Sequence, residues 1–206
     1  MANECISIVK DIVVALSAAG AALIAYKGLS TWQRELKGKS EYQLAKDVLR
    51  SAYKVREAFK HVRNPAIYVY EYPEDMLDQI GQLKKEHRYA GTAHVYEVRW
   101  KKLDEAFAEL EEKNLEALVE WGSEHQDTIV PLRKCRAELL IALQDLLARY
   151  KNPHQENWKN REEKANERST LYHLGEESEL DKFTPQINSA IELFEKWLRP
   201  HVSRKH

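Results

Sequence analysis

An uncharged run close to the amino terminus limits what this chain can fold into more than any other feature. Residues 12–26 read IVVALSAAGAALIAY, fifteen positions without a charged side chain. The run is apolar around the whole circumference of a helix, whereas a surface helix of a globular domain is apolar along one stripe. Extended to residues 6–26, it gives about 31 Å of helix at 1.5 Å per residue, close to the roughly 30 Å hydrocarbon core of a bilayer. It therefore predicts one N-terminal transmembrane helix, an anchor within residues 1–30.

Two alternatives to this anchor stay open. A buried core helix would also be apolar, and the two charges Lys10 and Asp11 weaken a span that has to include them. A cleaved signal peptide would need a small-residue site, which Ala19-Gly20-Ala21 resembles. Apolar residues continue beyond that site, however, where a cleavage site should end the apolar region.

Aromatic and basic residues predict how the anchor is oriented. Tyr26 and Trp32 are suited to the membrane–water interface on the C-terminal side of the run. Lys10 is the only basic residue before the run, whereas several follow it, namely Lys27, Arg34, Lys37, Lys39 and Lys46. By the positive-inside rule the N-terminus should lie outside and the C-terminal domain in the cytoplasm of a single-pass inner (plasma) membrane protein.

Small residues recur along the anchor at intervals of four. Such rows let transmembrane helices approach closely and associate. The candidate residues for self-association of the anchor are Ser17, Ala18, Ala21, Ala22 and Ala25. An alanine-rich helix without a partner is the alternative interpretation.

The formal net charge of -1 conceals a strong asymmetry. Residues 27–63 contain ten basic and four acidic side chains, whereas residues 64–206 contain 21 basic and 27 acidic ones. We therefore divide the chain after the anchor into a basic juxtamembrane neck with the first bundle helix (31–63) and an acidic helical bundle (64–206). Anionic lipids attract basic residues near the membrane surface, so the candidates for lipid contact are Arg34, Lys37 and Lys39. The basic residues further along could instead contact the acidic bundle or an acidic partner.

Apolar spacing in the neck predicts the first bundle helix. Gly38 should interrupt the preceding helix, and Ser40 with Gln43 has the form of a capping box. The helix should end before Pro65, with its charged residues, Arg63 among them, on the outward faces. Its apolar seam has steps of three and four, as in a coiled coil, and consists of Ala45, Val48, Ala52, Val55, Phe59 and Val62.

Two longer helices should form an antiparallel hairpin within the bundle. The first covers residues 93–121, and a helix restart at Gly91-Thr92 precedes it. Its heptad stripe consists of Trp100, Leu103, Phe107, Leu110, Asn114, Ala117 and Trp121. The second follows Pro131, with a stripe of Leu132, Cys135, Leu139, Leu143, Leu146 and Tyr150. The sequence thus predicts an all-α fold.

The remaining segments carry weaker signals. Residues 66–72 should be extended, with Tyr68, Tyr70 and Tyr72 either packed on the bundle or forming a stacking platform for bases or a peptide. A short helix should cover residues 73–88 and face inward through Met76, Leu77, Ile80 and Leu83. A solvent-facing helix at 154–168, with Gln155 in a capping box, should be followed by a loop at 169–183. A last helix should begin at Thr184-Pro185 and end at Pro200.

No residue pattern predicts catalysis, a cofactor or a metal site. The sequence lacks the phosphate-binding, dinucleotide-binding, zinc-protease and nucleophile-elbow motifs. None of its eight histidines forms a paired metal-ligand spacing, and Cys135 falls on an apolar helical stripe, which indicates a buried small residue. Nucleic-acid binding is disfavoured, because the chain as a whole is not basic.

Segments at both ends of the chain resemble uncharacterised bacterial proteins with an N-terminal membrane helix. The similarity lies in the juxtamembrane stretch TWQRELKGK at 31–39, in Glu41-Tyr42, in Tyr53-Lys54-Val55-Arg56, and in FEKWLRPHV at 194–202. The resemblance implies a bacterial inner-membrane setting and carries no activity or site residue.

The features together predict a membrane-anchored cytoplasmic helical interaction or scaffold protein, not an enzyme. Its expected partners are membrane lipids and either a protein partner or further copies of the same chain. Two other classes stay open: an oligomeric membrane-stress or phage-response effector, and an enzyme with an unrecognised helical site.

Overall fold

The computed structural model describes residues 2–152, 160–175 and 177–203, with side chains for all of these except 2–13 and 15. Every regular element in this described part is a helix, which confirms the predicted all-α class. The chain forms two compact units, Met1–Gln43 and Leu44–His206. We describe each unit by itself.

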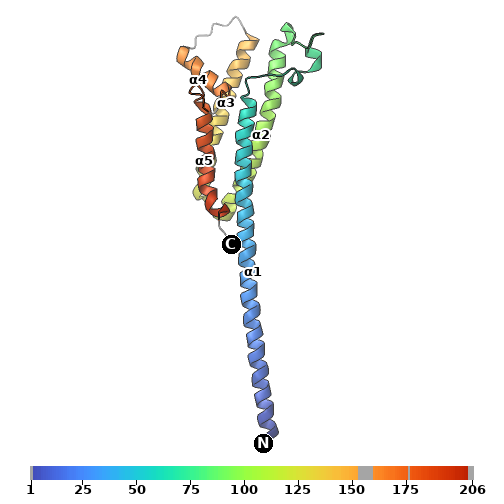
Figure 1. The fold of residues 1–206 in the computed structure, drawn as a ribbon, viewed down its shortest axis with the longest axis vertical. Helices are drawn as coiled ribbons and strands as arrows, with labels where there is room; N and C mark the ends of the chain where they lie inside the picture. The colour runs from blue at the N-terminus through green and yellow to red at the C-terminus, as the bar shows by residue number, and fades with distance from the viewer. Residues whose placement is uncertain (1, 153–159, 176, 204–206) are drawn as a thin grey trace. The chain divides into compact units, whose positions relative to one another are not determined.

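The first helix, α1 (Ala2–Val62), is longer than predicted because it continues through Gly38 and Ser40 (Figure 1). The expected break and capping box at these residues are therefore wrong. A glycine within a helix costs only about 1 kcal/mol relative to alanine, and no proline occurs before Pro65. The helix formers around Gly38, such as Leu36 and Lys37, outweigh that cost.

The predicted transmembrane span lies in the first unit. Within the part of the chain whose side chains the structure describes, no helix is long and apolar enough to cross a membrane. Residues 6–13 and 15 of the predicted span, including Lys10 and Asp11, fall outside that part.

The core of the second unit begins with the predicted seam of α1. All six seam residues, from Ala45 to Val62, are buried. Phe59 contacts Phe107 edge-to-face, with ring centroids 5.8 Å apart, and contacts Phe183 in the same way at 6.4 Å. The seam therefore joins α1 to α2 (Arg88–Trp121) and α5 (Phe183–Val202).

The hairpin of α2 and α3 (Val130–Lys151) is present as predicted, with the two helices antiparallel (Figure 1). A 3-10 helix, η4 (Ser123–Ile129), connects them. Gly122 has φ 87°, a left-handed conformation that glycine adopts without strain. The central stripe of α2 is buried, including Asn114, which takes the polar seam position predicted for it.

The connection between α1 and α2 differs from its prediction. Residues 66–72 include a 3-10 turn, η1 (Val69–Glu71), and the expected helix at 73–88 is replaced by two further turns, η2 (Glu74–Met76) and η3 (Lys85–His87). Ile80, expected to face inward, is 77% exposed. The spacing of the apolar residues therefore predicted a helix that does not form here. Pro73 and Gly81, which has a positive φ, favour turns instead.

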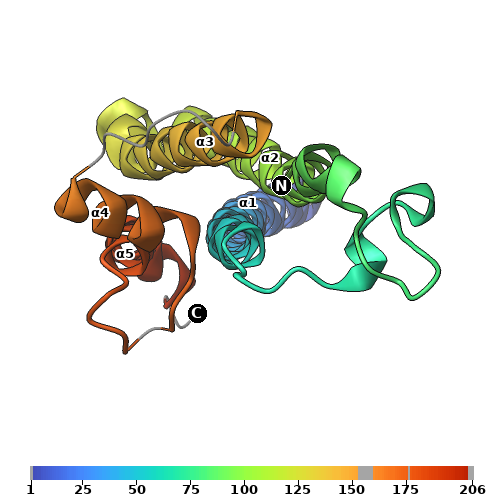
Figure 2. The ribbon, with the colours of Figure 1, turned by 90° about the horizontal axis from the view of Figure 1, so that it is seen from above.

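The helix restart predicted at Gly91-Thr92 is wrong, because both residues lie inside α2. A Cβ atom at Gly91 would lie 2.7 Å from the Leu83 side chain. Glycine therefore allows the connection to pack closely against the first turns of α2 (Figure 2).

The last two helices complete the bundle. In α4 (Arg161–Leu171), Asn160 accepts a hydrogen bond from the backbone of Glu163, and the Glu163 side chain accepts one from the Asn160 backbone. The capping box expected at Gln155 lies outside the described residues. The expected loop thus begins only after Leu171. Near the other end, α5 includes Pro200 and ends at Val202, slightly later than predicted.

Candidate functional site

The predicted membrane-contact residues all lie on the part of α1 in the first unit. Tyr26 and Trp32 are 73% and 57% exposed, respectively. Arg34 and Lys39 are also exposed, and Lys37 forms a long ion pair with Glu41 at 3.8 Å. The candidates for self-association, Ser17, Ala18, Ala21, Ala22 and Ala25, are exposed on the same helix. This helix thus presents apolar side chains followed by basic ones.

A basic cleft, which sequence reasoning missed, lies in the second unit between α4 and the segment leading into α5. Its volume is about 640 Å³. Arg161, Lys164 and Arg168 line it from positions of α4 that share one face, and Lys182 lines it from the start of α5. Glu179 is the one acidic residue among the described residues that line it. The cleft therefore concentrates positive charge in a region whose net charge is negative.

Apolar side chains also line the basic cleft, namely Ala165, Leu174 and Leu180, together with the polar Asn166, Ser169 and Ser178. No ion pair joins its four basic side chains to any residue in the described part of the chain. Four cations around one cavity repel each other, and an anion placed between them would relieve this repulsion. The cleft is therefore suited to an anionic group with an apolar portion.

A buried arginine positions the walls of the cleft. Arg63 donates to the carbonyl oxygens of Ser169 (2.8 Å), Thr170 (2.9 Å) and Tyr172 (3.0 Å) at the end of α4. It also forms a buried ion pair with Asp181, at 2.8 Å. Arg63 therefore ties the end of α4 to the start of α5, and its predicted place on an outward face is wrong.

The location of Arg63 beside the apolar seam could have been predicted from the sequence. It lies four residues after Phe59 and next to Val62, so it borders the apolar seam rather than the opposite face. Its acceptors, in contrast, are more than 100 positions away in the sequence. No local pattern indicates such long-range partners.

Asp181, Thr184 and His173 resemble a catalytic triad in composition only. The Thr184 hydroxyl is buried and donates to Asp181 Oδ2 at 2.7 Å. His173 Nδ1 lies 3.1 Å from this hydroxyl and 3.3 Å from the carboxylate, so one nitrogen faces both groups. In a triad the two ring nitrogens divide these contacts. The arrangement is therefore structural.

The environment of Asp181 favours its charged form. Burial alone would raise the pKa of its carboxyl group, but hydrogen bonds from the backbone and side chain of Thr184 and from Arg63 outweigh burial. The pKa of Asp181 is lowered to about 2. The Arg63–Asp181 pair thus stays ionised across the physiological range.

Neither a reactive thiol nor a metal centre emerges from the described residues. Cys135 is buried, as predicted, and burial raises the pKa of its thiol to about 11, so the nucleophilic thiolate is disfavoured. No group of three His, Cys, Asp or Glu side chains in the described ranges is arranged to hold a metal ion.

Comparisons with known proteins identify no relative of this chain. No family model, no curated protein and no solved structure matches the chain significantly.

Proposed function

We propose that this protein is a membrane-anchored helical scaffold. The N-terminal part of α1 would enter the inner membrane of a bacterium, and the bundle would hold a protein partner, or a second copy of the chain, at the cytoplasmic face. Tethering of this kind acts by raising the effective concentration of the partner at the membrane.

The exposed apolar surface of α1 in the first unit carries this proposal. Large apolar side chains stand exposed along this helix, namely Leu16, Leu23, Ile24, Tyr26, Leu29 and Trp32. Soluble monomers rarely expose such contiguous apolar surface. Lipid is the cover that also fits the basic residues that follow it, because anionic headgroups attract them.

Vesicle binding by the full chain tests the anchor. Co-flotation with vesicles of phosphatidylcholine and phosphatidylglycerol should be strong for the natural sequence. The variant Arg34→Gln/Lys37→Gln/Lys39→Gln should bind more weakly, because each basic residue near an anionic surface contributes about 1 kcal/mol.

A matched variant controls for the loss of charge. Lys101, Lys151 and Lys196 are exposed lysines of the second unit, and changing all three to Gln should leave co-flotation unchanged. If the natural chain stays with the soluble fraction, the anchor proposal is wrong. It is also wrong if both triple variants lose vesicle binding to the same extent.

The basic cleft is the surface we assign to the partner. An acidic segment of the partner would place its carboxylates between the cations of α4 and its apolar residues against Leu174 and Leu180. Pull-downs from detergent-solubilised membranes should recover a reproducible partner, and Arg161→Gln/Lys164→Gln/Arg168→Gln should lose it. Recovery of that partner at an unchanged level by this variant would exclude the cleft.

A second candidate function follows from the small residues on the same helix. Ala21 and Ala25 are exposed one turn apart, a spacing that allows two such helices to approach closely in a bilayer. An oligomeric effector that perturbs the membrane would therefore be toxic on overexpression, and Ala21→Leu should remove the toxicity. Absence of toxicity from the natural chain would count against this function.

A further inference from the structure

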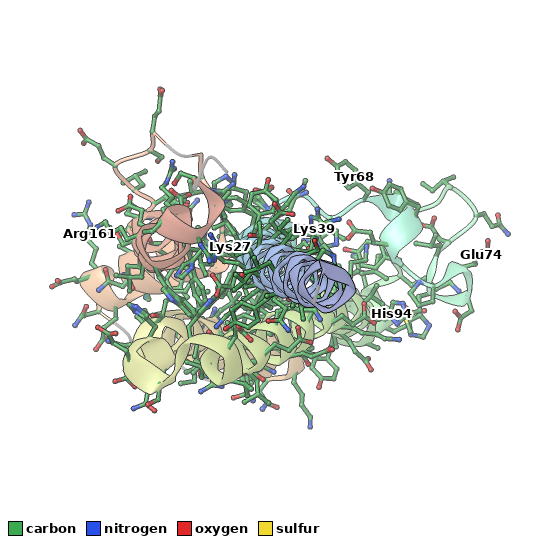
Figure 3. The ribbon with its side chains drawn as sticks, turned by 90° about the horizontal axis from the view of Figure 1, so that it is seen from below. Lys27, Lys39, Tyr68, Glu74, His94 and Arg161 are labelled. Carbon is green, nitrogen blue, oxygen red and sulfur yellow. The ribbon has the colours of Figure 1, made fainter. Side chains whose placement is uncertain are left out.

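A small pocket lies where the last turn of α1, the connection and α2 meet, away from the basic cleft. Figure 3 shows His94, beside this pocket, and Arg161, beside the cleft, on opposite sides of the second unit. The pocket has a volume of about 330 Å³. Nitrogen-bearing side chains line it from two helices, His61 from α1 and His94, Arg99 and Lys102 from α2.

Two nitrogen groups face each other in this pocket. Lys102 Nζ lies 3.5 Å from His61 Nε2. The pKa of His61 is lowered, first by burial and then by the positive charges of Lys102 and Arg99. His61 is therefore neutral near pH 7 and can accept a hydrogen bond from Lys102.

The acidic residue of the pocket is already neutralised. Arg99 holds both carboxylate oxygens of Glu71, at 2.7 and 2.8 Å. Arg99 also donates to the carbonyl oxygens of Asn64 and Ala66, at 2.7 and 2.6 Å. Neither Lys102 nor His94 has an acidic partner among the described residues, so the charge of Lys102 and the ring nitrogens of His94 are left for a ligand.

An aromatic pair borders the pocket. Tyr70 lines it and is 82% exposed. Its ring stacks on Tyr68 with centroids 5.5 Å apart and planes at 4°. Figure 3 shows Tyr68 on the same side of the unit as His94. The outward face of this pair is open to a further aromatic ring, and stacking of a base on an aromatic side chain contributes roughly 1–3 kcal/mol.

We propose that this pocket binds a soluble phosphate monoester with an aromatic group, of the nucleoside monophosphate class. Lys102 and protonated His61 hold the phosphate, His94 adds a third nitrogen, and the aromatic group stacks on Tyr70. The volume of the pocket exceeds that of a phosphate group and leaves space for part of the sugar.

Ligand binding should be coupled to protonation of His61. The charged groups that act on this ring are Lys102 and Arg99 on α2 and Glu71 on the connection, and His94 lines the same pocket from α2. Without a ligand the nearby cations of α2 disfavour a charged ring, whereas a bound dianion favours it. The affinity should therefore rise as the pH falls, with one proton taken up at His61.

Titration calorimetry of the full chain in detergent tests the proposal with adenosine 5′-monophosphate, inorganic phosphate and sulfate as probes. Adenosine monophosphate should bind with a Kd below about 1 mM, roughly tenfold more tightly than phosphate. Sulfate stays a dianion over this pH range, so any pH dependence of its binding comes from protonation of the protein. Its affinity should rise about threefold or more between about pH 8.5 and about pH 6.5.

Variants assign the effect to the pocket. Lys102→Gln should weaken binding about tenfold or more, and His61→Gln should reduce the pH dependence of sulfate binding. Lys101→Gln removes an exposed neighbouring charge outside the pocket and should change neither. Equal effects of Lys101→Gln and Lys102→Gln, or no binding of any probe, would overturn the proposal.

The same phosphate chemistry could come from a lipid headgroup. Mixed detergent micelles containing phosphatidic acid are therefore added as a competitor. If adenosine monophosphate stays bound in their presence, the result supports the soluble ligand. If it is displaced, and Lys102→Gln abolishes the displacement, the pocket binds lipid and the proposal is overturned. Vesicle co-flotation tests the anchor separately, so the two proposals can fail independently.

Discussion

The two units differ in the solvent exposure of their large apolar side chains. In the first unit Leu23 and Ile24 are 63% and 75% exposed, whereas in the second Leu103 and Phe107 are almost completely buried. Burial of a large apolar side chain contributes about 1.5–3 kcal/mol. The second unit gains this free energy from its own core, whereas these side chains of the first unit stay exposed.

The largest expected effect comes from a cavity in the second unit. Phe107→Ala should lower the free energy of unfolding by about 3–5 kcal/mol, because the buried ring contacts Phe59 and the space it leaves cannot collapse completely. Leu23→Ala should change it by less than about 0.5 kcal/mol. Chemical denaturation in detergent measures both, and similar losses for the two variants would contradict the contrast between the units.

A buried charge should cost nearly as much to disrupt. Arg63→Ala leaves Asp181 buried without its cation, for an expected loss of about 3 kcal/mol. Arg50, on the same helix, has a side chain 55% exposed in a pair with Asp47, and Arg50→Ala should cost less than about 0.5 kcal/mol. In the double variant Arg63→Ala/Asp181→Ala the loss should be smaller than the sum of the single losses. Additive losses would show that the two groups do not interact.

A smaller effect should appear on acidification of the second unit. The pKa of Asp181 in the folded state, about 2, lies below its ordinary value of 3.8. The charged form therefore stabilises the fold above about pH 4, and this contribution, roughly 2 kcal/mol, is lost as the pH falls towards about 2. The stability advantage of the natural chain over Asp181→Asn should narrow over this range in urea unfolding. A constant advantage would show that the Asp181 carboxyl group is not selectively stabilised in its charged form.

The heptad spacing predicted the core of the second unit because burial there follows helical periodicity. Val55 and Phe59 in α1 and Leu139 in α3 all face inward as expected. Periodicity failed where tertiary contacts decide the structure. The exposure of Ile80 depends on turns set by Pro73 and Gly81.

The basic cleft and the pocket between His61 and Lys102 were not predictable from local patterns. Lys182 joins the α4 cations only through the packing of α4 and α5, and His61 approaches Lys102 from another helix. Contacts over such long sequence separations have no periodic signature, so only the folded chain reveals these sites.

A fluorescent probe at one position in each unit tests the contrast most directly. In a Cys5→Ser background, Leu23→Cys and Val119→Cys place an environment-sensitive label at exposed positions of the first and second units, while buried Cys135 stays unreactive. On adding anionic vesicles, the label at position 23 should shift to shorter wavelength and the label at position 119 should not. Unchanged emission at position 23, or an equal shift at both, would contradict the assignment of the first unit to the membrane.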